Sequence, residues 1–138
     1  MLFYQNMDGM PDNLHHNGCY YMSLLYKHFD QLTQQQIIDL WNGAHLAGYI
    51  DSSDIIQKPR ELVDYLGLNL TYVDGHFDPG TSIPTNCYVV EEWYNPNTKF
   101  FHFMLGDGLG NIEYDPIEGG SLTHKEGHLY SLRFYNEA

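Results

Sequence analysis

The feature that most constrains the fold is a change in hydrophobic periodicity close to Gly67. Before this glycine, apolar residues recur at the three- and four-residue spacings of helices buried on one side. After it, the chain has the short β-rich runs and turn residues of strands. Helices followed by a run of strands is the order of an α+β fold, not of an alternating βαβ fold. Because the chain has 138 residues, we predict one α+β domain over residues 1–138, with N-terminal helices packed on an antiparallel sheet.

The first half of the chain predicts helices after an extended start and a loop over residues 1–18. The helices are expected over residues 19–29, 33–48 and 59–67. Thr33 and Gln36 have the spacing of a capping box, in which each side chain bonds to the backbone of the other residue. Pro59 suits the first position of a helix, because the N–H that proline lacks would be unpaired there.

The second half of the chain predicts an antiparallel sheet. Its strands are expected over residues 68–73, 86–94, 99–105, 111–114 and 129–135. The segments between them are rich in Gly, Pro, Asn and Asp, which are turn residues. Short turns join antiparallel neighbours, so we expect a meander that the last strand closes.

The charge balance excludes two classes of partner. Six Lys and Arg residues against eighteen Asp and Glu residues give a net charge of −12 at pH 7. A nucleic-acid-binding protein needs a basic surface to neutralise phosphates, and an anionic membrane surface also attracts basic segments. The chain shows neither a basic, apolar signal segment nor an apolar run of about 18 residues. We therefore expect no nucleic-acid partner, no membrane partner and a cytoplasmic location.

Cys19 is the candidate nucleophile. It follows the small polar turn Asn17-Gly18 and begins a helix with an apolar stripe. The first turn of a helix has unpaired N–H groups and the positive end of the peptide dipole. Both features favour the thiolate, which is the reactive form of cysteine. The other cysteine, Cys87, lies in an apolar run and is expected to be a small core residue.

His102 is the candidate base. It lies inside an expected strand in which Phe101 and Phe103 point to one face and His102 to the other. The other seven of the eight histidines lie in loops, polar connections or helices. The alternative for His102 is a hydrogen-bonded histidine of the core with no part in catalysis.

Asp115 is the candidate orienting group for the base. It lies thirteen residues after His102, at the end of the next strand of an expected hairpin. A hairpin folds the chain back on itself, so the end of one strand can lie near the start of its partner. The alternative is that Asp115-Pro116 simply ends a strand. A nucleophile, a base and an orienting group are the three parts that thiol catalysis requires.

The order of these motifs resembles the bacteriocin-processing (C39-like) branch of papain-like cysteine peptidases. Members have a cysteine at a helix start and, later, a strand histidine followed by Asp-Pro. The resemblance covers about residues 13 to 134. It implies a papain-like fold and a bacterial or phage thiol peptidase that hydrolyses a peptide, isopeptide or other amide bond. A peptide or protein is the implied substrate, and no metal or cofactor is implied.

The segment before the cysteine departs from the family pattern. The family usually has a glutamine six residues before the cysteine, where its amide helps to bind the oxyanion. Here that position is Asn13, and Gln5 is the other upstream amide. The resemblance implies that one of them shares this role with the Cys19 N–H. Tyr20 and Tyr21 replace the Gly-Pro that commonly follows the cysteine.

Two other functions remain open at the level of sequence. His15, His16 and Cys19 form a His-His-x-x-Cys group, but this spacing matches no common zinc site. The stronger alternative is a catalytically inactive papain-like domain that serves as an accessory or inhibitor protein. Such a protein would bind its partner through an acidic, tyrosine-rich surface, and Cys19 would be a small packing residue.

Overall fold

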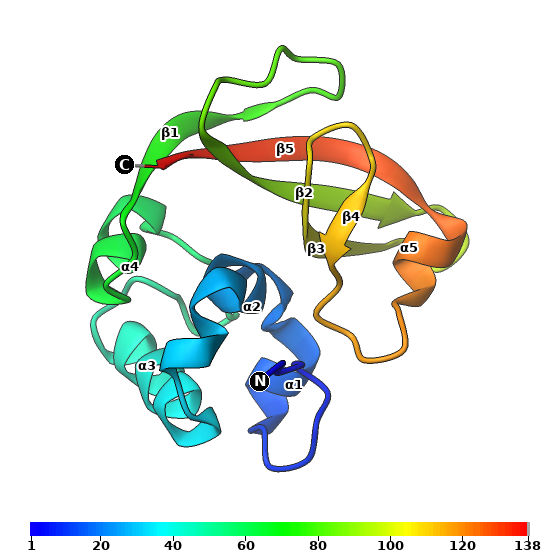
Figure 1. The fold of residues 1–138 in the computed structure, drawn as a ribbon. Coiled ribbons are helices and arrows are strands. Elements are labelled where there is room, and N and C mark those ends of the chain that lie inside the picture. Colours follow the sequence, from blue (N-terminus) through cyan, green and yellow to red (C-terminus); the bar gives the residue numbers. More distant parts are fainter. Residues whose placement is uncertain (138) are drawn as a thin grey trace.

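A computed structural model describes residues 1–137 and shows an α+β fold (Figure 1). The helical elements are α1 (Asp12–Asn17), α2 (Cys19–Leu25), the 3₁₀ helix η1 (Tyr26–Gln31), α3 (Gln34–Leu46), α4 (Pro59–Tyr65) and α5 (Leu122–Glu126). The strands are β1 (Leu70–Phe77), β2 (Cys87–Asn95), β3 (Phe100–Gly106), β4 (Ile112–Tyr114) and β5 (His128–Glu137). Helices α1 to α4 form one half of the molecule and the sheet forms the other, while α5 packs against β2 and β3.

The sheet is antiparallel, with the strand order β1-β5-β2-β3-β4. The predicted meander is therefore correct for β2, β3 and β4 but wrong for the last strand, which lies between β1 and β2. Residues 131–135 of β5 are buried, as expected for a strand with neighbours on both edges. Local turn signals cannot reveal this arrangement, because the pairing of β1 with β5 joins residues far apart in the sequence.

Two short helices were not predicted. Residues 12–17, expected to be part of a loop, form α1, and residues 1–11 contain no strand. Leu14 is the only buried residue of α1, so the helix has no apolar stripe to detect. Helix α5 is shorter still, and it is capped by Ser121, whose hydroxyl accepts a hydrogen bond from the His124 N–H. Helices this short are held by tertiary contacts rather than by their own propensity.

The longer helices agree with their sequence signals. Thr33 and Gln36 form the predicted capping box at the start of α3. Pro59 occupies the start of α4, and Cys19 is the first residue of α2. The expected helix over residues 19–29 is α-helical only to Leu25, and continues as the 3₁₀ helix η1.

The two faces of the sheet contact different apolar clusters. The face toward the helices contributes Tyr88, Val90 and Leu105 to the main core, together with side chains from α1 to α4. The other face carries a smaller cluster centred on Leu132 and Phe134. Cys87 packs against this smaller cluster and is half-buried, so it is less enclosed than predicted.

Helix α2 is fixed between the sheet and α3 by tyrosine hydroxyls. The Tyr88 hydroxyl donates to the Ser23 carbonyl oxygen at 2.6 Å, and the Tyr21 hydroxyl donates to the Ile37 carbonyl oxygen at 2.6 Å. The hydroxyls of Tyr20 and Tyr135 form a third bond, also at 2.6 Å. Because these bonds cross from α2 to β2, α3 and β5, they set the position of Cys19 relative to the sheet. Among residues 1–137, no helix is long and apolar enough to cross a membrane.

Candidate active site

Cys19 is held at the start of α2 by a tight junction with α1. Only Gly18 separates the two helices, and its N–H donates to the Leu14 carbonyl oxygen at 2.9 Å. A Cβ atom at position 18 would lie 2.5 Å from that oxygen. Glycine therefore permits the close approach that brings Cys19 to the helix start, where first-turn N–H groups have no helical partner.

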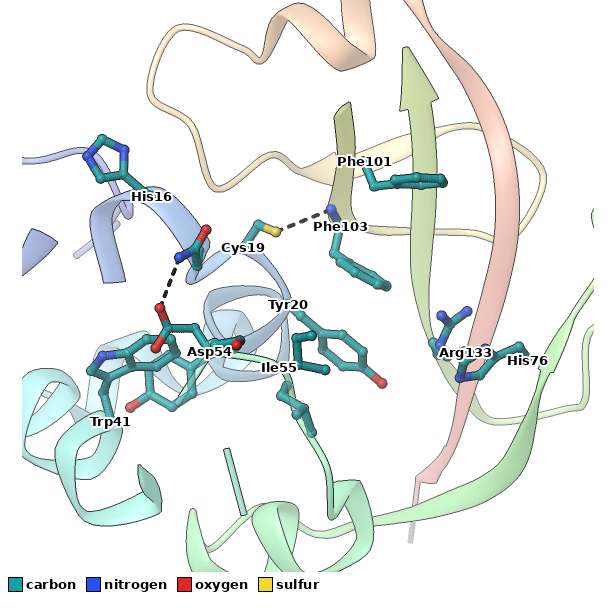
Figure 2. Close-up of a pocket in the computed structure, with 14 residues that line it drawn as sticks. His16, Cys19, Tyr20, Trp41, Asp54, Ile55, His76, Phe101, Phe103 and Arg133 are labelled. Atoms are coloured by element: carbon teal, nitrogen blue, oxygen red, sulfur yellow. Dashed lines mark hydrogen bonds between the residues drawn. The ribbon is translucent and has the colours of Figure 1, made fainter. Parts of the chain in front are cut away.

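The thiol lies at an open edge of β3. Strand β4 pairs only with Leu105 and Gly106 of β3. The Phe103 N–H is therefore not used by the ladder with β4, and it donates to the Cys19 sulfur at 3.4 Å (Figure 2). A backbone N–H directed at sulfur favours the thiolate, because a negative charge strengthens the hydrogen bond.

His102 joins Cys19 to Asp115. Its Nε2 atom lies 2.8 Å from Asp115 Oδ1, and both side chains are almost fully buried. Since Nε2 is occupied by Asp115, Nδ1 is the ring nitrogen that remains for Cys19, and the charges of the two side chains interact. The structure thus brings together the candidate nucleophile, base and orienting group that were named from the sequence.

Asp115 is fixed by bonds from its own loop. The N–H groups of Ile117 and Ser121 donate to its carboxylate at 3.0 and 2.7 Å. The neighbouring Pro116 carbonyl oxygen accepts from the Gln5 N–H at 2.9 Å, which joins this loop to the N-terminal segment. The carboxylate therefore has a single orientation, and it holds the His102 ring in turn.

The electrostatics favour a thiolate–imidazolium pair. Burial opposes ionisation of the Cys19 thiol, but the charge of His102 and hydrogen bonds from His102 and Phe103 outweigh it, so the pKa of Cys19 lies below its ordinary value. Burial also opposes the charged form of His102, yet Cys19 and Asp115 raise the pKa of His102 to about 9. Burial of Asp115 is outweighed by its hydrogen bond and charge interaction with His102, which lower the pKa of Asp115 to about 2.

A cavity of about 280 Å³ opens beside Cys19 (Figure 2). Its apolar lining is supplied by Tyr20, Tyr21, Trp41, Ile55, Phe101 and Phe103. Polar side chains also line it, among them Asn17, Asp54 and Arg133. Cys19 lines this cavity and is partly exposed.

Neither amide that the sequence offered for the oxyanion lines this cavity. Asn13 lines a different cavity with His45, and its Nδ2 atom lies 3.4 Å from Asp54 Oδ1. Gln5 is buried, and its Nε2 atom donates to the His15 carbonyl oxygen at 2.9 Å. The structure therefore does not bring Asn13 or Gln5 together with Cys19 in one cavity, and their assignment to the oxyanion stays a prediction.

Asn17 and Asp54 are polar residues of this cavity that the sequence argument missed. Asn17 lies two residues before Cys19, and its Nδ2 atom donates to Asp54 Oδ2 at 2.9 Å. Its place two residues before the cysteine was a signal that could have identified it as a residue of the site. Nothing local connects Asp54 with Cys19, because the two residues are joined only by the fold.

Within residues 1–137, no group of three or more His, Cys, Asp or Glu side chains could hold a metal ion. Comparisons with known protein families, curated proteins and solved structures found no match for this chain.

Proposed function

We propose that this protein is a thiol-dependent hydrolase of a peptide, isopeptide or other amide bond, on a papain-like fold of the C39-like branch. The observation that carries the proposal is the connected set of Cys19, His102 and Asp115. The sulfur accepts a hydrogen bond from a backbone N–H, its charge interacts with that of His102, and His102 Nε2 bonds to a fixed carboxylate. A packing cysteine and a structural histidine would not need this arrangement.

The proposed reaction proceeds through an acyl-enzyme. The Cys19 thiolate attacks the amide carbonyl carbon, a carbon–sulfur bond forms, and the carbonyl π electrons move to the oxygen. His102 gives its proton to the leaving nitrogen as the carbon–nitrogen bond breaks. Water then attacks the thioester, with His102 accepting its proton, and thiolate is regenerated. Asp115 holds the imidazole throughout.

The proposed substrate is a peptide or protein, bound without a cofactor. The apolar walls of the cavity beside Cys19 suit a side chain of such a substrate. The proposal includes no nucleic-acid or membrane partner, because the net charge is −12. A cytoplasmic location is proposed with it.

The experiment is the rate of Cys19 alkylation by iodoacetamide as a function of pH. It is made in a Cys87→Ala background, so that only one thiol reacts, and is compared with His102→Ala. The proposal predicts a thiolate that titrates well below the free-cysteine value of about 8.5, and a return toward that value in His102→Ala. A thiol that titrates normally and does not respond to His102→Ala would contradict it.

The second candidate is an inactive domain that binds a partner protein. It is favoured by a surface cluster of aromatic side chains, in which Phe101 packs against Tyr94 and Tyr130 at ring-centre distances of 4.7 and 5.0 Å. Phe101 and Tyr130 are each about half exposed. An ordinary, unresponsive thiol in the alkylation experiment would favour this candidate over the hydrolase.

A further inference from the structure

The cavity beside Cys19 contains a second hydrogen-bonded chain that does not include His102. Asn17 donates from Nδ2 to Asp54 Oδ2 at 2.9 Å, and Asp54 Oδ1 lies 2.8 Å from His45 Nε2. Figure 2 shows the bond to Asp54 as a dashed line on the side of Cys19 away from Phe103. The chain runs from the α1–α2 junction, through the loop after α3, to the last turn of α3.

We infer that Asn17 is the side-chain oxyanion donor of this site, and that Asp54 and His45 are positioning residues that act through it. This inference rests on the proposed function, because an oxyanion forms only if Cys19 attacks a carbonyl. It names the residue that shares the oxyanion with the Cys19 N–H.

Position separates Asn17 from the other upstream amides. Asn17 and Cys19 line the same cavity and are two residues apart. The side-chain nitrogen of Gln5 is directed at the His15 carbonyl oxygen, and Asn13 lines a different cavity. Asn17 is therefore the upstream amide that a carbonyl group bound at Cys19 would meet.

Asp54 determines which end of the Asn17 amide is presented. A carboxylate only accepts hydrogen bonds, so the amide must turn its NH₂ group toward Asp54. An NH₂ group has two hydrogens, and the bond to Asp54 uses one of them. The second hydrogen remains for an oxyanion in the cavity.

His45 holds the Asp54 carboxylate from the side of α3. Its Nδ1 atom lies 2.8 Å from the Trp41 carbonyl oxygen and its Nε2 atom 2.8 Å from Asp54. The ring is therefore held between these two oxygens, and it fixes the position of the Asp54 carboxylate in turn.

The loop that carries Asp54 is fixed in shape. The Asp51 carboxylate accepts from the Ser53 and Ile55 N–H groups at 2.9 and 3.0 Å, and from Gln57 at 2.7 Å. Asp54 itself has a φ of 66°, in the left-handed region that non-glycine residues seldom adopt. A backbone held in this region by its surroundings is often found where a side chain must be aimed.

The test compares two reagents, of which only one reacts through an oxyanion. Iodoacetamide alkylates the thiolate by displacing iodide, with no carbonyl addition. With p-nitrophenyl acetate, the thiolate adds to the ester carbonyl, the oxygen takes the electron pair, and the intermediate then expels p-nitrophenolate to leave acetyl-Cys19. Both rates are measured in the full chain with Cys87→Ala, and Cys19→Ala provides the blank.

Asn17→Ala is expected to slow acetylation about 100-fold, as loss of one oxyanion donor does, and to leave alkylation within about twofold. Asp54→Asn is expected to slow acetylation about tenfold, because the amide loses its orientation. Asn42→Ala is the matched control, since it removes an exposed amide that lines a different cavity and has no assigned role, and both of its rates should be unchanged. Equal acetylation rates in Asn17→Ala and the parent would overturn the inference, as would an equal loss of both reactions.

A double variant separates positioning from a general structural effect. If Asp54 acts only through Asn17, Asp54→Asn should not slow acetylation further in the Asn17→Ala background. A further loss there would show that Asp54 does not act through Asn17. Failure of the hydrolase proposal gives a different result. In that case Cys19 of the parent protein itself would be alkylated by iodoacetamide as an ordinary thiol.

Discussion

The molecule contains two histidine–aspartate pairs with the same separation but different surroundings. In each pair, a histidine Nε2 atom lies 2.8 Å from an aspartate Oδ1 atom. In His102–Asp115, the remaining ring nitrogen, Nδ1, is the one available to the Cys19 thiol. In His45–Asp54, it faces the carbonyl oxygen of Trp41, one turn earlier on the same helix. A base needs a nitrogen free to exchange a proton with its nucleophile, so only the first pair can act as one.

The comparison also shows what the supporting elements contribute. His102 lies on a strand and Asp115 in the loop after the next strand, so the pair is set by the sheet and by the loop bonds from Ile117 and Ser121. His45 lies on α3 and Asp54 in the fixed loop that follows it. The first arrangement aims a histidine at sulfur, whereas the second aims a carboxylate at an amide.

The largest expected difference between the two pairs is in the rate of Cys19 acetylation when each histidine is removed. We predict that His102→Ala lowers acetylation of Cys19 by p-nitrophenyl acetate at neutral pH about 100-fold, because the imidazolium that stabilises the thiolate is lost. His45→Ala should lower it no more than about tenfold, through the orientation of Asn17. Stopped-flow release of p-nitrophenolate measures both. Equal losses in the two variants would remove the distinction between the pairs.

Neutralising each aspartate should affect alkylation differently. In Asp115→Asn, the charge that helps to hold His102 protonated is lost, so alkylation by iodoacetamide at neutral pH should fall about tenfold, which corresponds to about one pKa unit. Asp54→Asn should leave alkylation unchanged, because Asp54 has no bond to His102. Alkylation rates measured at several pH values in the Cys87→Ala background test both expectations. Slower alkylation of Asp54→Asn than of the parent would contradict the second.

Asp115 should also make stability depend on pH in acid. Its pKa is about 2 in the folded protein and near 3.9 in an unfolded chain, so the folded state favours the charged form. The stabilisation, about 2 kcal/mol, is fully present above the unfolded pKa and is lost as the pH falls through about 2. Urea unfolding from pH 5 to pH 2 should therefore show a steeper loss in the parent than in Asp115→Asn. Parallel curves would contradict the lowered pKa.

The smallest expected effect concerns the helix that carries His45. Thr33→Ala removes the hydroxyl of the capping box at the start of α3 and should lower the free energy of unfolding by about 1 kcal/mol. Alkylation of Cys19 should not change, because α3 contributes nothing to the thiol's own hydrogen bonds. Urea denaturation and alkylation of the same preparation test both statements. A change in the alkylation profile would mean that the two regions are coupled.

The sequence predicted the parts of the fold whose signals are local. The capping box of α3, the proline at the start of α4 and Cys19 at the start of α2 each lie within one helical turn, and each was found as predicted. Helix α1 has one buried residue and therefore no periodic pattern. The place of β5 inside the sheet depends on pairing between distant residues, which no local pattern records.

The same reasoning explains which site residues were foreseen. His102 lies on one strand of a hairpin and Asp115 directly follows the other, so sequence spacing alone indicated that they could meet. Asn13 was placed by its distance from Cys19 in the sequence, but the turn of α1 carries its side chain into a different cavity. Asp54 reaches the cavity only through the packing of the loop after α3, which the sequence could not reveal.

The most direct test of the central claim is the ionisation of His102, followed by NMR of the imidazole nitrogens in the parent protein and in Cys19→Ala. The account predicts that His102 stays protonated until about pH 9 in the parent, because the thiolate of Cys19 stabilises its positive charge. In Cys19→Ala, the ring should lose its proton at a clearly lower pH, since that partner is gone. A His102 that titrates at the same pH in both proteins would show that no thiolate–imidazolium pair exists.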